Sequence, residues 1–600
     1  MCGFIGGISK TPLSSSNFNQ ANSHIICRGP DKNLFFNNKN TVFTNSLDNY
    51  YHFEFNRLSI LDLSESANQP MYSSTFDSLL MFNGEIYNHA ELRDELKSNG
   101  VKFQTSHSDT EVILKGLSKF GMDFIEKLNG QFSIFFINNK SKKAYLARDR
   151  LGQKPLYFSL KNNTLLFSSN FISINELLTS STINEESLNN YLNLGVIPGE
   201  KTLIDDISEV LPSQIVEVDI QNLQIKRKKI YWDISKLNTN FSFNNEEYFS
   251  LFDNAVKIRQ NADVPVAYFL SGGIDSTSIV KSAQQTSGDK INTFSVIQGN
   301  SKYDESYWSD IAAQVFNTNH TKQLIDSNLN IESIQSALCS LDQPYFDPSV
   351  LPSFLLSKEI SKHYKVAISG DGGDELLGGY ERIIKSDSIK LRTNFSKLLF
   401  NIYPSIFGTG NKILRYSKKN VNAYWSFHED LKLLNLLKMN PIFSYRNNYT
   451  NSKYNLSLKE LMIADYKFFL SEMMLFKVDR TSMANSLEVR SPFLDHRLIE
   501  YVLGSNLSFI DSNNPKIIMK NYLKENFDEE FLNRKKQGFV FDVENWVFEN
   551  INYIKSEMKN SIIINEFNKD IFNKLSLIKS RVNGIRIWKL FVLENFMKRL

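Results

Sequence analysis

The sequence predicts a protein of two domains, α+β in its first part and α/β in its second. In the first part, three short apolar runs are typical of hairpins in an antiparallel sheet: residues 131–137, 144–147 and 165–168. In the second part, the apolar run Val264–Leu270 leads into a pair of glycines and then into a helical pattern. Further strand-like runs at 291–297 and 365–369 indicate βαβ connections and therefore an open parallel sheet.

Length and composition are ordinary for a globular protein. The chain has 600 residues, of which 42% are hydrophobic and 22% charged, and a net charge of +3, which gives no reason to expect binding to nucleic acid or to a membrane surface. Its three cysteines are too few for a disulfide framework, and none has zinc-ligand spacing with a histidine. With no signal peptide and no apolar run long enough to span a bilayer, we expect a cytoplasmic protein.

The segment Ser271–Gly–Gly–Ile–Asp–Ser276 follows the strand Val264–Leu270 and opens a helix. Paired glycines let the backbone turn tightly, and a helix N-terminus offers unsatisfied N–H donors and a partial positive charge. A phosphate would fit there, although the common G-x-x-x-x-G-K-[ST] loop is absent from the chain. The alternative is a simple turn before a helix.

Cys2 would become the first residue if the initiator methionine were removed, which a small second residue permits. An α-amino group has a pKa of about 8 and a thiol one of about 8.5, so a terminal cysteine carries its own base. Many proteins also begin with Met-Cys by chance.

Four further motifs follow Cys2–Gly7 in order: Arg28–Asp31, Arg57–Asp62, Asn83–Asn88 and Ser108–Glu111. With this ordered set, the chain resembles the glutamine amidotransferase domain of the N-terminal nucleophile class, as fused in glutamine-dependent asparagine synthetases. The resemblance implies an αββα sandwich for the first domain. It also implies that the second domain is an open-sheet ATP-pyrophosphatase unit with a helical C-terminal part.

The resemblance assigns a role to each residue of a glutamine site, and glutamine needs all of them because it carries a carboxylate, an ammonium and an amide. Cys2 would attack the amide. Asn83 and Gly84 would stabilise the oxyanion, while Glu85 and Asp109 would hold the ammonium. Arg57 would bind the carboxylate, and the residues after it would contribute to glutamine binding: Leu58, Ser59, Ile60 and Leu61. Taken singly, Arg57 could equally be a surface ion pair and Asn83–Gly84 a hairpin turn.

The second domain resembles the family's ATP site. Asp275 and Asp374 are suitable ligands for a Mg²⁺ ion that bridges ATP phosphates. The two glycine loops should face each other at the carboxyl edge of the sheet. The resemblance implies that ATP and pyrophosphate contact Leu270, Ser271, Gly272, Gly273, Asp275, Ser276, Val296, Ser369 and Gly370.

One residue departs from the family pattern. Asp371 stands where the best-known asparagine-forming members have glutamate, and we expect it to act as a base or to position the intermediate. Lys520 matches a family lysine that contacts the phosphates during adenylation. The segment 476–495 resembles a conserved family block, which we interpret mainly as helix packing and buried ion pairs, and 534–539 resembles the family's R-x-K-x-GF segment.

We therefore expect a glutaminase domain at 1–210, a connector at 211–245 and an ATP-dependent synthetase domain at 246–600. The expected partners are the small-molecule substrates glutamine, ATP and aspartate or another carboxylate, and a second copy of the chain in a homodimer. The segment Asp347–Ser349, where acceptor contacts are expected, contains no arginine for an α-carboxylate. A relative that amidates another carboxylate, such as a uronic acid or a metabolite precursor, is the main alternative. A regulatory protein with decayed sites and a tRNA-thiolating enzyme are further alternatives.

Overall fold

The structure is a computed structural model that describes residues 2–37, 49–237, 239–297, 306–324, 330–383, 420–450, 456–511, 514–534, 541–559, 561 and 570–600. Most of the expected 534–539 segment lies outside these residues, as does much of 385–460. In the described part of the chain, no helix is long and apolar enough to cross a membrane.

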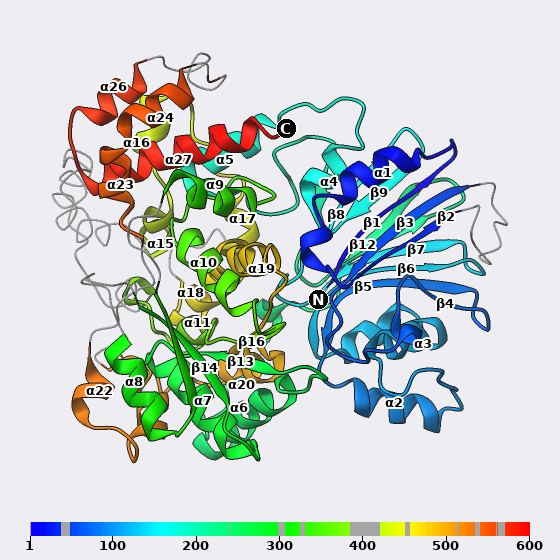
Figure 1. The fold of residues 1–600 in the computed structure, drawn as a ribbon, viewed down its shortest axis with the longest axis horizontal. Coiled ribbons are helices and arrows are strands. Elements are labelled where there is room, and N and C mark those ends of the chain that lie inside the picture. Colours follow the sequence, from blue (N-terminus) through cyan, green and yellow to red (C-terminus); the bar gives the residue numbers. More distant parts are fainter. Residues whose placement is uncertain are drawn as a thin grey trace.

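Two six-stranded antiparallel sheets form the first domain (Figure 1). The first has the order β10 (Ser208–Glu209), β8 (Tyr157–Lys161), β9 (Thr164–Ser168), β1 (Gly3–Ser9), β3 (Tyr50–Arg57), β2 (Lys32–Asn37). The second has the order β12 (Gln224–Ile230), β11 (Gln214–Asp219), β7 (Lys143–Arg148), β6 (Gly130–Asn138), β5 (Ser78–Ile86), β4 (Met71–Ser73).

The two sheets pack face to face, and helices cover their outer faces. The rings of Phe135 on β6 and Phe167 on β9 stack at 3.9 Å between centroids, which places them in the core between the sheets. Alternate residues of β6, Phe132, Ile134 and Phe136, pack outward in a second apolar cluster with residues of α2 (His89–Ser98) and α3 (Asp109–Phe120). With α1 (Ser15–Asn22) and α4 (Phe171–Asn175) on the other face, the predicted αββα sandwich is confirmed.

The first domain extends beyond the boundary expected at residue 210. Strands β11 and β12 lie in the segment expected to be a connector, yet β11 pairs with β7 and so continues the second sheet. The basic run 226–229 lies on the exposed edge strand β12, where three of its lysines are ion-paired with acidic residues. Edge charges of this kind discourage pairing with another chain.

The second domain contains a five-stranded parallel sheet in the order β15 (Asn319–Leu324), β14 (Asn292–Ile297), β13 (Val266–Phe269), β16 (Val366–Ile368), β17 (Glu488–Arg490). The predicted parallel sheet is thus confirmed. The helices nearest the sheet are α6 (Asn245–Arg259), α7 (Ile274–Thr286), α8 (Ser306–Val315), α10 (Val350–Ile360), α11 (Gly373–Leu376), α19 (Leu475–Met483), α20 (His496–Gly504), α21 (Ile517–Leu523) and α22 (Glu529–Asn533).

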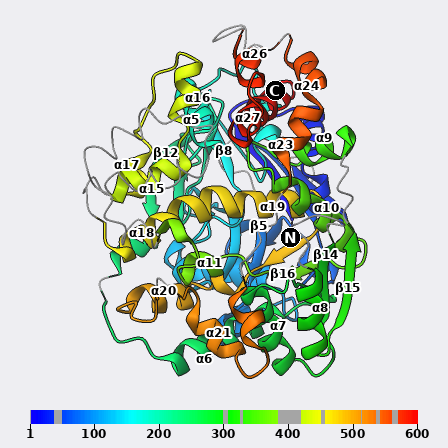
Figure 2. The ribbon, with the colours of Figure 1, turned by 90° about the vertical axis from the view of Figure 1, so that its left-hand side faces the viewer.

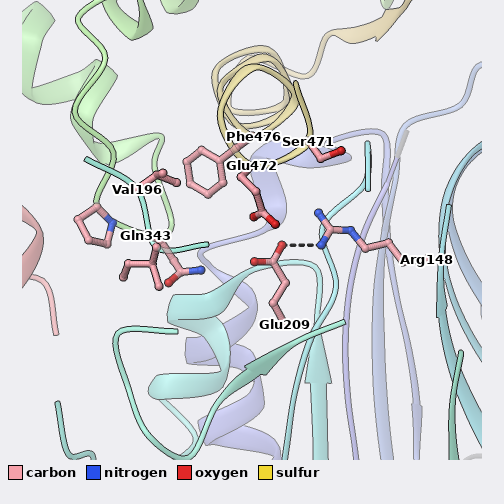
Figure 3. A pocket seen from close by; sticks show the side chains of 9 residues that line it. Arg148, Val196, Glu209, Gln343, Ser471, Glu472 and Phe476 are labelled. Carbon is pink, nitrogen blue, oxygen red and sulfur yellow. Dashed lines mark hydrogen bonds and ion pairs between the residues drawn. The ribbon is translucent and has the colours of Figure 1, made fainter. Parts of the chain in front are cut away.

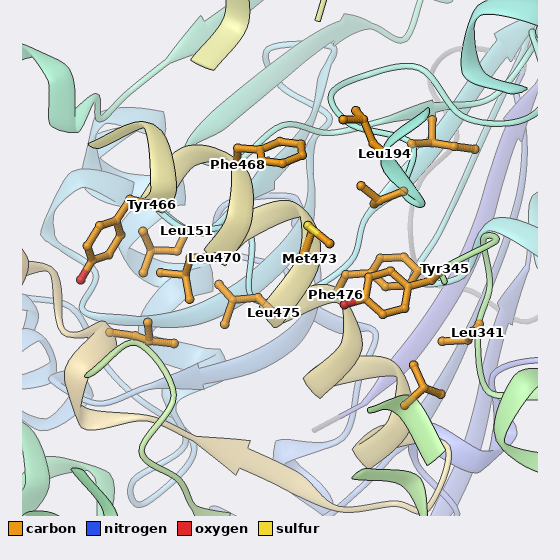
Figure 4. Packing of buried hydrophobic residues seen from close by; sticks show 14 of the residues in the cluster. Leu151, Leu194, Leu341, Tyr345, Tyr466, Phe468, Leu470, Met473, Leu475 and Phe476 are labelled. Atoms are coloured by element: carbon orange, nitrogen blue, oxygen red, sulfur yellow. The ribbon is translucent and has the colours of Figure 1, made fainter. Parts of the chain in front are cut away.

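A helical region lies beyond the sheet. It is made of α5 (Glu185–Leu194), α9 (Ile331–Cys339), α15 (Asn420–His428), α16 (Leu431–Leu436), α17 (Arg446–Tyr449), α18 (Leu458–Asp465), the π-helix η5 (Tyr466–Met474), α23 (Val543–Glu549), α24 (Ile551–Met558), α26 (Ile571–Ser576) and α27 (Arg581–Met597). Its last helices, α23, α24, α26 and α27, lie at the upper left of Figure 1 and the top of Figure 2. Figure 4 shows η5 and the start of α19 packed against residues of both domains, among them Leu151, Leu194 and Tyr345.

Candidate active sites

The predicted nucleophile lies at the start of the central strand β1. Cys2 is buried, and its backbone N–H donates to Asn83 Oδ1 at 3.1 Å. Burial raises the pKa of the Cys2 thiol, while the Leu58 N–H and the Arg57 charge act to lower it. The structure therefore brings Cys2 together with the predicted oxyanion residue and with the segment that follows Arg57.

Strand β5 carries the next three predicted residues, Asn83, Gly84 and Glu85. Gly84 has φ +155°, and a Cβ built on it would lie 2.0 Å from the Gln131 carbonyl oxygen on β6. Only glycine fits this position, and its backbone is thereby fixed beside the Asn83 amide. This geometry agrees with the oxyanion role expected for the pair.

Two buried carboxylates lie near one another at this end of β5. Asp109 opens α3 and accepts the Ile86 N–H at 3.1 Å, and burial raises its pKa to about 6. Glu85 is also buried, which raises its pKa well above the usual range even though Arg490 Nη2 lies 3.1 Å from Glu85 Oε2. An ammonium group placed against these carboxyls would favour their ionised forms.

Arg57 ends β3, and its guanidinium is held by three oxygens. It donates to the Ser64 carbonyl at 2.9 Å, to Asn68 Oδ1 at 2.7 Å and to the Asp62 carbonyl. The residues that follow are fixed as well: the Ser59 N–H donates to Asp31 Oδ2 at 2.7 Å, and the Ile60 carbonyl accepts the Asp263 N–H at 2.9 Å. The guanidinium is therefore oriented before any ligand arrives.

The predicted phosphate loop has the expected strand–turn–helix form. It joins β13 to α7, and Gly273 is the N-cap of that helix. Gly272 has φ +74°, and a Cβ on it would lie 2.5 Å from the Trp308 carbonyl carbon, so glycine is required there. The Gly273 N–H donates to Ser271 Oγ at 3.2 Å, and Ser271 Oγ lies 3.2 Å from Ser276 Oγ.

The second glycine loop follows β16 and lies against the first, as predicted. A Cβ on Gly373 would lie 2.8 Å from Asp275 Cγ, and one on Gly370 would lie 3.2 Å from Asp275 Cβ. Ser369 Oγ donates to Asp371 Oδ2 at 2.7 Å. This bond fixes the side chain of Asp371, the residue that differs from the family pattern, at the carboxyl edge of the sheet. Leu270 and Val296 lie at the carboxyl ends of the neighbouring strands β13 and β14, and the Leu270 N–H donates to the Phe294 carbonyl on β14.

A lysine that the sequence analysis missed joins the two predicted metal ligands. Lys516 Nζ lies 2.5 Å from Asp374 Oδ1 and also forms an ion pair with Asp275 Oδ2. Lys520, which was expected to contact the phosphates, instead donates to Asn514 Oδ1 at 2.6 Å and Asn533 Oδ1 at 3.1 Å. The only signal for Lys516 was its place one helical turn before Lys520.

The two aspartates fit a divalent cation that also binds phosphate. Both are held close enough to share one cationic group, Lys516, and Asp275 Oδ1 is buried without a hydrogen-bond partner among the described residues. Mg²⁺ prefers a few carboxylates together with phosphate and water oxygens. Asp275 and Asp374 would hold such an ion, as the resemblance implies.

Ion pairs and apolar side chains connect the two sites. Arg28 donates to the Cys2 carbonyl at 3.3 Å and to Asp479 Oδ2 on α19 at 2.8 Å. The side chains of Leu58 and Ile60 form an apolar cluster with Val366 of β16 and Met483. Residues next to the predicted nucleophile therefore touch the strand that leads into the second glycine loop.

A pocket between the domains contains none of the predicted site residues (Figure 3). Its charged side chains have partners: Arg148 Nη1 lies 2.7 Å from Glu209 Oε1, and Glu472 Oε1 accepts from Tyr449, which lies outside the pocket, at 2.6 Å. Burial, with a smaller effect of Glu209, raises the pKa of Glu472 to about 7. We interpret this pocket as part of the packing between domains.

The fold and the two sites define a class of protein: an αββα domain with a buried N-terminal cysteine, joined to an open parallel sheet whose glycine loops converge on two aspartates. Residues 1–232 match the glutamine amidotransferase domain, and residues 247–575 match asparagine synthase. The chain belongs to the asparagine synthase family and carries a glutamine amidotransferase domain at its N-terminus.

The chain is also similar to curated proteins along most of its length. It is 29% identical to asparagine synthetase [glutamine-hydrolyzing] 1 of Bacillus subtilis, over 92% of this chain and 89% of that protein. It is 32% identical to the putative asparagine synthetase [glutamine-hydrolyzing] 2 of Methanocaldococcus jannaschii, over 80% and 98%. Among solved structures, the glutamine phosphoribosylpyrophosphate amidotransferase of B. subtilis covers 44% of this chain and 60% of its own, at 15% identity and a TM-score of 0.28, too low to support a comparison.

Proposed function

We propose that this protein is a cytoplasmic, glutamine-dependent asparagine synthetase. Glutamine is hydrolysed at Cys2, ammonia passes within the chain, and ATP activates the side-chain carboxylate of aspartate. The products are glutamate, asparagine, AMP and pyrophosphate. Membership of the family supports glutamine-dependent amidation, and the choice of aspartate is the further step of the proposal.

In the first reaction, Cys2 Sγ attacks the amide carbon of glutamine, and the α-amino group of a terminal Cys2 accepts the thiol proton. The Asn83 side chain and the Gly84 N–H stabilise the negative charge on the amide oxygen. Ammonia leaves as the C–N bond breaks, and water then hydrolyses the thioester. Arg57 binds the carboxylate of glutamine, while Glu85 and Asp109 bind its ammonium.

In the second reaction, an oxygen of the acceptor carboxylate attacks the α-phosphorus of ATP, and the bond to pyrophosphate breaks. The N-terminus of α7 and the loop Ser271–Gly273 hold the departing pyrophosphate. Mg²⁺ bound by Asp275 and Asp374 would neutralise phosphate charge. Ammonia then attacks the acyl carbon, AMP leaves with the former carboxylate oxygen, and Asp371 takes a proton from the nitrogen.

The observation that carries this proposal is an apolar contact between the glutamine site and the strand that leads to the second glycine loop. The Leu58 peptide N–H faces Cys2, while the side chains of Leu58 and Ile60 pack on Val366, three residues before Ser369. An apolar contact of this kind suits neutral ammonia better than ammonium or bulk water. Ammonia released at Cys2 would therefore meet an apolar contact on the side that faces the second domain.

A second candidate function keeps the chemistry and changes the acceptor. Asp371 is one methylene shorter than the glutamate that the family resemblance leads us to expect, and Ser369 Oγ holds its carboxylate at 2.7 Å. A shorter side chain leaves room for a different acceptor, such as a uronic acid or a metabolite precursor.

Measurement of AMP and product mass separates the two candidates. The purified protein is incubated with ATP, Mg²⁺ and glutamine, with and without aspartate. Equal amounts of asparagine and AMP that form only with aspartate would support the first candidate. Glutamine hydrolysis without aspartate-dependent AMP would favour the second, and uronic acids would then be tested as acceptors.

A further inference from the structure

A buried lysine without a carboxylate partner lies in the first turn of α19. Lys477 exposes 7% of its surface; its Nζ donates to Ser349 Oγ at 3.1 Å and lies 3.9 Å from the sulfur of Met474. Within the described part of the chain, no Asp or Glu forms an ion pair with Lys477. Burial of an ammonium without an opposite charge is costly, so an anion would complete this position.

The other charged residues of α19 do have partners, which makes Lys477 distinct. Asp479 is paired with Arg28 at 2.8 Å and with Lys154 at 3.3 Å. Arg480 is paired with Asp342 at 2.9 Å. Among the charged residues of α19, Lys477 is therefore the one without an oppositely charged partner in the described part of the chain.

The topology places Lys477 and Ser349 at the edge of the sheet that carries the two glycine loops. Helix α10 leads into β16 and α19 leads into β17, and these two strands are parallel neighbours. A helix that connects parallel strands runs back along the sheet, so the first turns of α10 and α19 lie at the carboxyl edge. That edge also carries the loops Ser271–Gly273 and Gly370–Asp374. The two helices pack together, as Figures 1 and 2 show.

Ser349 is suited to share an anion with Lys477. It is the N-cap of α10, and its side chain makes no capping hydrogen bond, so its hydroxyl accepts from Lys477 and keeps a proton to donate. The helix N-terminus adds a partial positive charge, part of which Asp347 uses because its Oδ1 accepts the Ser349 N–H at 2.9 Å. Residues 346–349 are only partly buried, so a ligand at the carboxyl edge of the sheet could reach Ser349.

We propose that Lys477 and Ser349 bind a second carboxylate of the acceptor, the one that is not adenylated. This inference rests on the proposed function and narrows it to acceptors with two carboxylates, such as aspartate, whose α-carboxylate Lys477 would hold. It supplies the cation that the segment Asp347–Ser349 lacks. A uronic acid has a single carboxylate and would leave Lys477 unpaired.

The test compares aspartate with its α-amide, in which a neutral amide replaces the α-carboxylate. AMP formation is measured for the wild type, Lys477→Met, Lys477→Arg and Ser349→Ala, with Lys358→Met, an exposed lysine of α10, as the matched control. We expect Lys477→Met to raise the KM for aspartate at least about tenfold, Ser349→Ala to raise it less, and Lys477→Arg to retain part of the affinity.

The wild type should prefer aspartate to the α-amide, and Lys477→Met should lose that preference. Glutamine hydrolysis and the KM for ATP should stay unchanged in every variant, which shows that the variants are folded. An unchanged KM for aspartate in Lys477→Met overturns the inference alone, as does efficient amidation of a monocarboxylate by the wild type. Absence of AMP with every carboxylate tested overturns the proposed function, and the inference with it.

Discussion

The two candidate sites differ in how their carboxylates are compensated. In the glutamine site, burial dominates: it raises the pKa of Asp109 to about 6 and that of Glu85 well above its usual range despite the contact with Arg490. In the ATP site, Asp275 and Asp374 are already ion-paired with Lys516. The first site would therefore gain stability from the ammonium of its substrate, whereas the second must rearrange an existing ion pair when phosphates and a metal ion bind.

The largest effect is expected when the predicted nucleophile of the glutamine site is removed, because only one of the two reactions should then be lost. Cys2→Ala removes the nucleophile, so glutamine hydrolysis should fall at least about a thousandfold. With ammonium salts as the nitrogen source, AMP and amide formation should continue near the wild-type rate, because the ATP site is intact. Glutamate release and AMP formation measure the two halves. Loss of the ammonia-dependent reaction would show that the sites are not chemically independent.

A change in the ATP site should give the reverse pattern. Asp374→Asn removes one charge from the proposed metal site, and AMP formation should fall about a hundredfold. Glutamine hydrolysis without ATP should be unaffected. Asp94→Asn, which removes the charge of an exposed ion-pair partner of Lys97 on α2 of the first domain, serves as the control. If Asp374→Asn retained full activity, Asp374 would not be a metal ligand.

Lys516 and Lys520 are expected to contribute unequally to AMP formation. Because Lys516 contacts both aspartates, Lys516→Met should lower AMP formation about thirtyfold, the loss that corresponds to about 2 kcal/mol for a hydrogen bond between charged groups. Among the described residues, the Lys520 ammonium bonds to two asparagine side chains and to no carboxylate, so Lys520→Met should have the smaller effect. The kcat and the KM for ATP of both variants test this order. The reverse order would restore the role predicted from the sequence for Lys520.

The smallest effect expected concerns pH. Protonation of Asp109 competes with the ammonium of glutamine, so below its pKa of about 6 it should lower kcat/KM for glutamine hydrolysis by a further tenfold or so per pH unit, beyond the fall due to protonation of the α-amino group. Asp109→Asn should have a low kcat/KM whose pH profile lacks this further fall. A wild-type profile that is flat between pH 5 and 7 would contradict the role of Asp109.

Much of this architecture was predictable because its signals are local. The strand, glycine pair and helix around Gly272 are contiguous in the sequence. The motifs around Cys2 and Asn83 lie on strands of the two facing sheets, and the family resemblance is what joined them into one site. Lys516, Arg490 and Lys477 were not recognised as site residues, because their importance depends on contacts between segments far apart in the chain. No periodic pattern in the sequence predicts the ion pair between Arg490 of β17 and Glu85 of β5.

In the segment 211–245, which was expected to be a connector, the local sequence signals pointed away from the strands that the structure contains. Proline, asparagine and basic residues made 211–245 resemble a linker, and β12 has almost no buried face to reveal it as a strand. Its identity comes from backbone hydrogen bonds to β11, which in turn pairs with β7. Edge strands that are solvated on both faces lack the alternation from which strands are predicted.

The ion pairs between the domains also restrict how such a protein could be assembled from parts. Arg28 is buried against Asp479, and Glu85 against Arg490, so each half supplies the counter-charge for the other. A foreign glutaminase domain fused to this synthetase would need an arginine and a carboxylate at these two places. Without them, Asp479 and Arg490 would be buried with fewer partners, and the hybrid would lose stability before any question of catalysis arose.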